Sequence, residues 1–399
     1  MNRRVFYAEA SYSEDEINAV INVLKNQRLC LMAGDNVKEL EKKVAKLFNK
    51  NYGLMVNSGS SANLIGILSL NLKKGSKVIT PSLTFSTTVS PIVQSGLVPY
   101  FIDVERDTLQ INTKILKEIE LDNVSAICVP NLVGNIANWE EIYDFAKNNN
   151  LKVIEDSADT IGYSYETKFE NSADISTTSF YASHVITGAG FGGMTCFKDK
   201  NNFELGLSLR GWGRRSSLYE NSEDHERRFN SKIADINYDD KYIFDDIAYN
   251  FLPSEISAAF ALVQLEKLSI NLRKRIENFN FLKDNLSSSD NFFIPKSYKN
   301  INTGWLAFPI ILKNKLKNKR KELQIFLERN GIQTRTIFTG NIMKQPVAKK
   351  FKWDSFGTFE SSDEIMKSGL LLGSHNRQSK SNLDYLVAKL IEAEQIFTK

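Results

Sequence analysis

A chain of 399 residues is long for one hydrophobic core, so we expect a large domain followed by a smaller one. Its 42% hydrophobic and 25% charged residues are typical of globular proteins, and 51 Lys plus Arg against 47 Asp plus Glu leave a net charge of +4, which does not indicate nucleic-acid binding. Cys30, Cys128 and Cys196 form no CxxC or Cys/His cluster, which argues against disulfide, zinc and iron–sulfur sites and favours a reduced, cytoplasmic protein without bound metal.

The first expected elements are helical. Residues 13–26 and 37–50 space apolar residues at helical intervals, and the earlier segment begins with a serine cap and acidic residues. Residues 52–70 run from a short apolar strand through a Ser/Gly turn into an apolar helix. The opening residues lack the apolar stretch of a signal peptide, and no run of about 18 apolar residues occurs in the sequence, so we expect no membrane association.

Further strand-like segments follow, each separated from the next by a helical or turn-rich stretch: KVITPS, VPYFIDV, SAICVPNL and KVIEDS. This alternation predicts an α/β fold with a mostly parallel sheet covered by helices. The polar segment 214–241 is expected to be a long functional loop or a piece ordered by a partner subunit.

A helix over residues 253–286 is expected to join the two domains, which we place at 1–270 and 271–399. The tail combines the strand-like segment 304–312 with a helical pattern that ends the chain, which predicts a small α+β domain.

Gly59 and Ser60 lie in a Ser/Gly turn, NSGSSAN, where backbone N–H groups, hydroxyls and a helix amino terminus could converge on a phosphate. An ordinary capped helix start has the same pattern. Asp156 ends the strand-like segment KVIEDS, and ligands bind at the carboxyl ends of strands in open α/β sheets. Such a carboxylate could keep a pyridine nitrogen protonated, although a helix cap after a strand would look the same.

The segment SFYASHVITGAGFGG, residues 179–193, contains His184 and a G-x-G-x-x-G match. A dinucleotide-binding fingerprint must follow a strand and open a helix, whereas these glycines precede the apolar GGMTCF, so we expect no dinucleotide. Taken alone, His184 could be a packed structural histidine.

These segments occur in order, and the chain is similar over nearly its whole length to the DegT/DnrJ/EryC1/StrS family. The resemblance is carried by NSGSSANL, TPSLTFSTT, NLVGNIANWEEI, IEDSADTIG, SFYASHVIT, RGWGR, YNFLPSEISAAFALVQLEKL and TRTIFTGNIMKQP. The family consists of fold-type I pyridoxal-phosphate enzymes that act on nucleotide-linked keto sugars, which implies the aminotransferase fold with a large domain built on a seven-stranded type of sheet. Within it the chain looks most like the 4-keto-6-deoxyhexose 3-dehydratases of the GDP-4-keto-6-deoxymannose type, which carry histidine where other members carry the cofactor lysine.

The resemblance implies a role for residues that match the family by position. Gly59, Ser60 and Ser179 would bind the cofactor phosphate, and Phe85 would stack on the pyridine ring. Asp156 would pair with the ring nitrogen.

Asp159 would lie near the ring hydroxyl, where aminotransferases usually have glutamine, and His184 would be the acid/base catalyst. Asn250 resembles an asparagine that reaches the phosphate from the neighbouring subunit, so the resemblance implies a homodimer with shared active sites.

Candidate substrate-binding residues are charged or polar positions in RGWGR and TRTIFTGN, each with a solvated or structural role as the alternative: Arg210, Trp212, Arg335 and Asn341. Relatives that act on CDP sugars carry cysteines for an iron–sulfur cluster, but the loop after RGWGR contains none, so no cluster is expected.

The resulting hypothesis is a dehydratase that uses pyridoxamine 5'-phosphate or pyridoxal 5'-phosphate to remove the C3 hydroxyl of a nucleotide-linked 4-keto-6-deoxyhexose. L-Glutamate would restore the amine form of the cofactor. Imidazole cannot hold the cofactor covalently as lysine does, so amino transfer is disfavoured and elimination favoured. The alternatives are a sugar aminotransferase or epimerase-like relative with unattached cofactor, and a non-enzymatic relative that kept the fold. The nucleotide stays open.

Overall fold

The computed structural model describes residues 3–27, 30–166 and 170–399. Within these ranges the main sheet runs in the order β1-β8-β7-β5-β4-β2-β3-β14. Its strands are β1 (Tyr52–Val56), β2 (Lys77–Pro81), β3 (Val98–Ile102), β4 (Val124–Pro130), β5 (Lys152–Ser157), β7 (Ile175–Ser179), β8 (Gly193–Phe197) and β14 (Asp354–Ser355). β8 is antiparallel to β1 and β7, and the neighbours from β7 to β14 are parallel. The predicted α/β fold with a mostly parallel sheet is confirmed.

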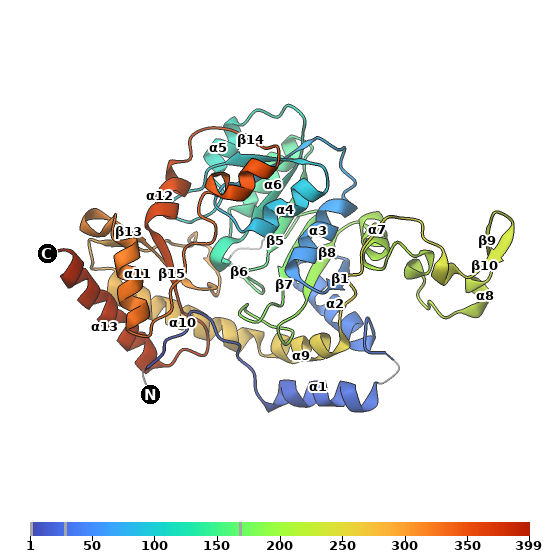
Figure 1. Ribbon diagram of the computed structural model, residues 1–399, viewed down its shortest axis with the longest axis horizontal. Coiled ribbons are helices and arrows are strands. Elements are labelled where there is room, and N and C mark those ends of the chain that lie inside the picture. The colour runs from blue at the N-terminus through green and yellow to red at the C-terminus, as the bar shows by residue number, and fades with distance from the viewer. Residues whose placement is uncertain (1–2, 28–29, 167–169) are drawn as a thin grey trace.

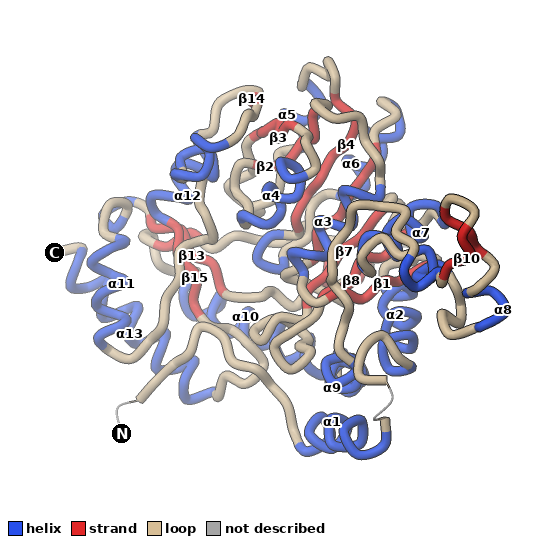
Figure 2. Tube along the Cα trace, turned by 45° about the vertical axis from the view of Figure 1, so that its right-hand side comes forward, coloured by secondary structure: helices blue, strands red, loops and turns tan. Residues whose placement is uncertain are grey.

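Helices cover both faces of this sheet (Figures 1 and 2). One face packs against α3 (Gly59–Ser69), α4 (Ser86–Gln94) and α7 (Lys200–Arg210), and the other against α2 (Asp35–Leu47), α5 (Thr113–Glu118), α6 (Trp139–Asn148) and α9 (Glu255–Glu266). Burial on both faces explains the continuous apolar runs of the central strands. The carboxyl ends of β4, β5 and β7 meet at one edge, where a ligand can bind.

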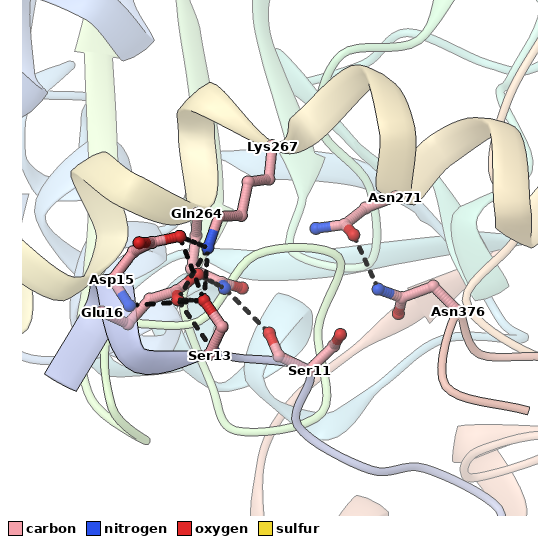
Figure 3. A network of polar contacts seen from close by, with 8 residues as sticks. All are labelled: Ser11, Ser13, Asp15, Glu16, Gln264, Lys267, Asn271 and Asn376. Carbon is pink, nitrogen blue, oxygen red and sulfur yellow. Dashed lines mark hydrogen bonds and ion pairs between the residues drawn. The ribbon is translucent and has the colours of Figure 1, made fainter.

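The amino-terminal helix α1 (Glu14–Asn26) lies on α9 (Figure 1). Ser13 and Glu16 form a capping box at its start, as the sequence predicts. The buried Glu16 carboxylate also accepts hydrogen bonds from Gln264 Nε2 at 2.6 Å and from Lys267 Nζ at 2.9 Å (Figure 3). Nearby, Asn376 Nδ2 donates a hydrogen bond to Asn271 Oδ1 at 2.8 Å. The hydrogen bonds of Glu16 fix α1 on α9 and on Lys267, which follows α9.

The expected helix over 253–286 is present as α9 and α10 (Leu268–Leu286), with Lys267 between them. The carboxyl-terminal part contains a sheet in the order β11-β13-β15 with helices packed on it. Its elements are β11 (Phe292–Phe293), β13 (Phe308–Leu312), α11 (Arg320–Arg329), α12 (Glu360–Ser368), β15 (Gly369–Leu372) and α13 (Lys380–Phe397), and β12 (Ile301–Asn302) pairs with β6 (Ser164–Tyr165).

Two segments cross the boundary expected near residue 270. β14 extends the large sheet beside β3, and Val5 bridges Ile332 in the carboxyl-terminal part. The two parts are therefore joined by backbone pairing as well as by α10.

The polar segment 214–241 projects from the body at the right of Figure 1. It carries α8 (His225–Arg228) and a hairpin of β9 (Ser231–Ile233) and β10 (Ile236–Tyr238). Arg228 pairs there with Asp239 and with Glu223. In the described part of the chain, no helix combines the length and the apolar character needed to cross a membrane.

Candidate active site

A cavity of about 770 Å³ opens at the carboxyl ends of β5 and β7, beside the amino terminus of α3. The structure brings most of the predicted cofactor residues and the predicted catalytic histidine to its wall: Gly59, Ser60, Phe85, Asp156, Asp159, Ser179 and His184. These residues come from separate segments of the chain, and the fold brings them together on one cavity.

The amino terminus of α3 forms a cradle for an anion. Ser58 caps the helix by accepting a hydrogen bond from Ser61 N at 3.1 Å, and the first N–H groups of a helix have no partner within the helix. A Cβ atom on Gly59 would lie 2.6 Å from the Cβ of Ser179, so glycine is required for this close approach. The cradle has the N–H and hydroxyl donors that a phosphate accepts.

Asp156 is a buried carboxylate held from several sides. Its Oδ2 accepts hydrogen bonds at 2.8 Å from both Asn63 Nδ2 and Thr88 Oγ1, and its Oδ1 accepts one at 3.1 Å from Ala158 N. Burial raises the pKa of Asp156, while these donors oppose the rise. A protonated ring nitrogen beside the carboxylate would keep it ionised.

Sequence reasoning missed Asn63 and Thr88, which position Asp156. Asn63 also accepts a hydrogen bond from Thr177 Oγ1, so its amide is fully engaged at the buried face of α3. The available signal was a polar residue inside an otherwise apolar helix, because such a residue needs a buried partner.

His184 lies on the wall of the same cavity. Its Nδ1 is 3.4 Å from the carbonyl oxygen of Ser179, which can only accept, so Nδ1 carries the proton and Nε2 has the free lone pair. Nε2 lies 4.0 Å from Oδ1 of Asp159. Burial lowers the pKa of His184 to about 4 and raises that of Asp159 to about 7. His184 is therefore an uncharged base at neutral pH.

Aromatic side chains form the remaining walls. Phe85 is 49% exposed and meets Phe338 edge to face at 5.7 Å between ring centroids, which leaves a face of Phe85 open to a planar ligand. Tyr7 and Tyr181 also line the cavity and were not predicted. Tyr7 lies far from the motifs in sequence and carries no signal, whereas Tyr181 lies three residues before His184 in SFYASHVIT, and that position was the available signal.

The predicted substrate-binding residues do not all gather here. Arg335 lines a neighbouring chamber of about 720 Å³ that shares Tyr7, Phe85 and Phe338 with the cavity. Asn341 is buried and donates to Asp363 Oδ1 at 2.8 Å, outside both walls.

Arg210 is buried, with its Nη1 2.8 Å from Glu41 Oε1 and 2.9 Å from the carbonyl oxygen of Met55. It lies outside the cavity wall, which favours the structural alternative for Arg210. Trp212 stacks under Arg214 at 4.4 Å in the loop that follows, and it also lies outside the wall. Asn250 is exposed and does not line the cavity.

Among the described residues that line the cavity there is no lysine. An aldehyde bound in this cavity would meet no lysine amine among these described lining residues. Nor do the described ranges contain a group of three or more histidine, cysteine, aspartate or glutamate residues placed to hold a metal ion.

Comparisons with known proteins point to one family. The model of the DegT/DnrJ/EryC1/StrS aminotransferase family matches residues 10–391. The chain is 33% identical over 365 residues to the lipopolysaccharide biosynthesis protein RfbH of Salmonella typhimurium, covering 88% of this chain and 83% of that protein.

Another relative is the dTDP-4-dehydro-2,6-dideoxy-D-glucose 3-dehydratase of Saccharopolyspora spinosa, which is 31% identical over 95% of this chain and 84% of its own length. A crystal structure of GDP-4-keto-6-deoxymannose-3-dehydratase with a trapped PLP-glutamate geminal diamine superimposes with a TM-score of 0.87 at 28% identity, covering 97% of this chain and 100% of that one.

Proposed function

The chain belongs to the DegT/DnrJ/EryC1/StrS aminotransferase family, and from that premise we propose that it is a pyridoxal-phosphate-dependent 3-dehydratase of nucleotide-linked sugars. It removes the C3 hydroxyl of a nucleotide-linked 4-keto-6-deoxyhexose and yields a 4-keto-3,6-dideoxyhexose. The observation that carries this proposal is His184, an uncharged base on the wall of a cavity where no described residue is a lysine.

The residues of the cavity fit pyridoxamine phosphate. Gly59, Ser60 and Ser179 would hold its phosphate, Phe85 would cover its ring, and Asp156 would pair with the ring nitrogen. When bound, the cofactor supplies a protonated pyridine ring that accepts electron density from the reacting carbon. Asp156 sustains that protonation because Asn63 and Thr88 hold its carboxylate in place.

His184 moves the protons. Its Nε2 would accept the proton that leaves the methylene carbon of the cofactor and would return it to the C3 hydroxyl, which would then leave as water. A hydroxide is a poor leaving group, so delivery of this proton is required for elimination. Oδ1 of Asp159 lies 4.0 Å from Nε2, beyond hydrogen-bond distance, so the lone pair of Nε2 stays free to accept this proton.

L-Glutamate is the proposed amino donor, supported by the PLP-glutamate adduct trapped in the similar dehydratase. We also propose a homodimer in which Asn250 completes the partner's phosphate site, and its exposure supports this role. The nucleotide stays open, since the relatives are named for dTDP and GDP sugars. The scattered cysteines support a cytoplasmic location.

Product analysis tests the function. The protein, pyridoxal phosphate and glutamate are incubated with GDP-, CDP- and dTDP-4-keto-6-deoxyhexoses, and the products are analysed by mass spectrometry. We expect loss of the C3 oxygen from one substrate and release of ammonia. An amino sugar that retains the C3 oxygen would show an aminotransferase instead.

A further inference from the structure

Arg275 is a buried cation without a carboxylate partner. It lies on α10, is 1% exposed, and its Nε has no hydrogen-bond partner among the described residues, which also place no carboxylate in salt-bridge contact with it. Burial lowers its pKa to about 10. Burying an unpaired charge opposes folding, so stability does not explain why an arginine occupies this position.

The guanidinium of Arg275 holds a backbone segment of the cavity wall. Its Nη1 lies 3.1 Å from the carbonyl oxygen of Leu306 and 3.4 Å from that of Trp305. Leu306 lines the cavity, and its N–H donates to the carbonyl oxygen of Val133 at 2.9 Å. Arg275 on α10 is therefore linked by hydrogen bonds, through the 305–306 backbone, to the turn at Val133.

That turn is strained and holds Asp159. Val133 has a φ of 59°, which is an outlier for a β-branched residue. In this conformation its N–H donates to Asp159 Oδ2 at 2.8 Å. Gly134 follows with a φ of 75°, and a Cβ atom there would lie 2.6 Å from the nitrogen of Leu306. The strained turn and the 305–306 backbone are thus pressed together beside Asp159.

We propose that Arg275 is a positioning residue of the active site, although it does not reach the cavity. Its guanidinium fixes the backbone that holds Asp159 in place, and its unmatched positive charge opposes protonation of His184. The first role rests on the proposed function, whereas the second is a property of the protein without substrate.

The charge of Arg275 has to be weighed against the other groups around His184. In the described chain these come from the loop after β5, from β5 itself, from the amino-terminal segment and from the loop of the histidine: Asp159, Asp156, Tyr7 and Tyr181. Burial lowers the pKa of His184, the Ser179 carbonyl opposes this, and Arg275 lowers it further. Arg275 is thus the cation whose removal should raise that pKa.

The test uses the three histidines of the chain as probes. Wild type, Arg275→Met, Arg275→Lys and Arg273→Met are labelled at histidine Cε1, and the ring signals are titrated by NMR without cofactor, with His184→Asn for assignment. Arg273 is the matched control because it is exposed on the same helix. Arg275→Gln replaces Arg275→Met if the latter does not fold.

We expect Arg275→Met to raise the His184 midpoint by about one pH unit, while Arg275→Lys and Arg273→Met keep the wild-type value. His225, on the projecting arm, should not move in any variant. An unchanged His184 midpoint in the neutral variants overturns the proposal, and so does an equal shift in Arg275→Lys. In holoenzyme with an identified substrate, the acidic limb of kcat/KM should move with the midpoint. Because the titration needs no substrate, its failure is separate from a failure of the proposed reaction.

Discussion

Nε2 of His184 lies 4.0 Å from Oδ1 of Asp159, inside a cavity that favours the uncharged form of both groups. The pKa of His184 is lowered to about 4, so its base form persists well below the usual range of histidine. We expect kcat/KM to stay constant as the pH is lowered from neutral and to decrease only as the pH approaches about 4, where His184 becomes protonated.

Replacing His184 by asparagine should lower kcat by on the order of 10² to 10⁴, the contribution typical of a general acid–base group, without loss of cofactor binding. His225→Asn, on the exposed arm, is the control that should keep wild-type activity. Steady-state kinetics and absorbance of bound cofactor check both. Full activity in His184→Asn would remove the histidine from the mechanism.

His184 and Asp159 should affect the stability of the folded protein in opposite directions as the pH changes. The fold lowers the pKa of His184 from 6.5 to about 4, so this group costs stability as the pH falls through that window. The fold raises the pKa of Asp159 from 3.8 to about 7, so this group costs stability as the pH rises through its window.

Between pH 7 and pH 5 the drop in Tm of the cofactor-free protein should therefore be smaller in His184→Asn than in wild type, and larger in Asp159→Asn. Differential scanning fluorimetry at the two pH values measures both drops. Shifts of the same sign in the two variants would contradict the assigned burial effects.

The phosphate cradle depends on the close approach of Gly59 and Ser179. Gly59→Ala would place a Cβ 2.6 Å from that of Ser179, so the start of α3 must shift. We expect the affinity for pyridoxal phosphate to fall about tenfold or more, since 1.4 kcal/mol of misfit is enough for that. Absorbance titration measures the affinity. Wild-type affinity in Gly59→Ala would contradict the cradle.

Local patterns marked the Ser/Gly turn, the acid after a buried strand and the segment around His184, but each had a structural alternative, and only the family resemblance implied their roles. The fold places Gly59, Asp156 and His184 on one cavity. The parallel sheet followed from the alternation of apolar strands and helices.

Contacts between distant segments could not be predicted in this way. Arg210 looks like an anion-binding residue until the fold brings Glu41, far away in the sequence, against its guanidinium. β14 adds a short pairing to the large sheet that propensity does not reveal, because its stability comes from its neighbour β3. The positive φ of Val133 could not be predicted either, because valine rarely adopts this conformation.

One such distant contact ties the carboxyl-terminal part to the large sheet. Asp103, just after β3, accepts hydrogen bonds from Ser361 N at 2.9 Å and Ser362 N at 3.0 Å and so caps α12. Asp103→Ala should lower the free energy of unfolding by about 1–2 kcal/mol, as for a lost helix cap. Urea unfolding measures the change, with Asp107→Ala, whose side chain is 50% exposed, as control. Equal stability of the two variants would show that the cap contributes nothing.

The last prediction concerns the support of Asp156. Asn63 and Thr88 each donate to its Oδ2 at 2.8 Å, and a hydrogen bond to a charged group contributes about 1.5–3 kcal/mol. If the carboxylate must stay ionised during the reaction, Thr88→Val and Asn63→Ala should each lower kcat by about 10- to 100-fold. Asp156→Asn, which removes the charge, should lower it further.

Thr80→Val is the matched control, because the buried Thr80 Oγ1 has no hydrogen-bond partner among the described residues and the substitution keeps the shape of the side chain. It should leave kcat unchanged. Kinetics with saturating cofactor separate a loss of catalysis from a loss of binding. If Thr88→Val matched Thr80→Val in kcat, the hydrogen bond to Asp156 would have no part in keeping the ring nitrogen protonated, and the carboxylate would be ionised by its partner alone.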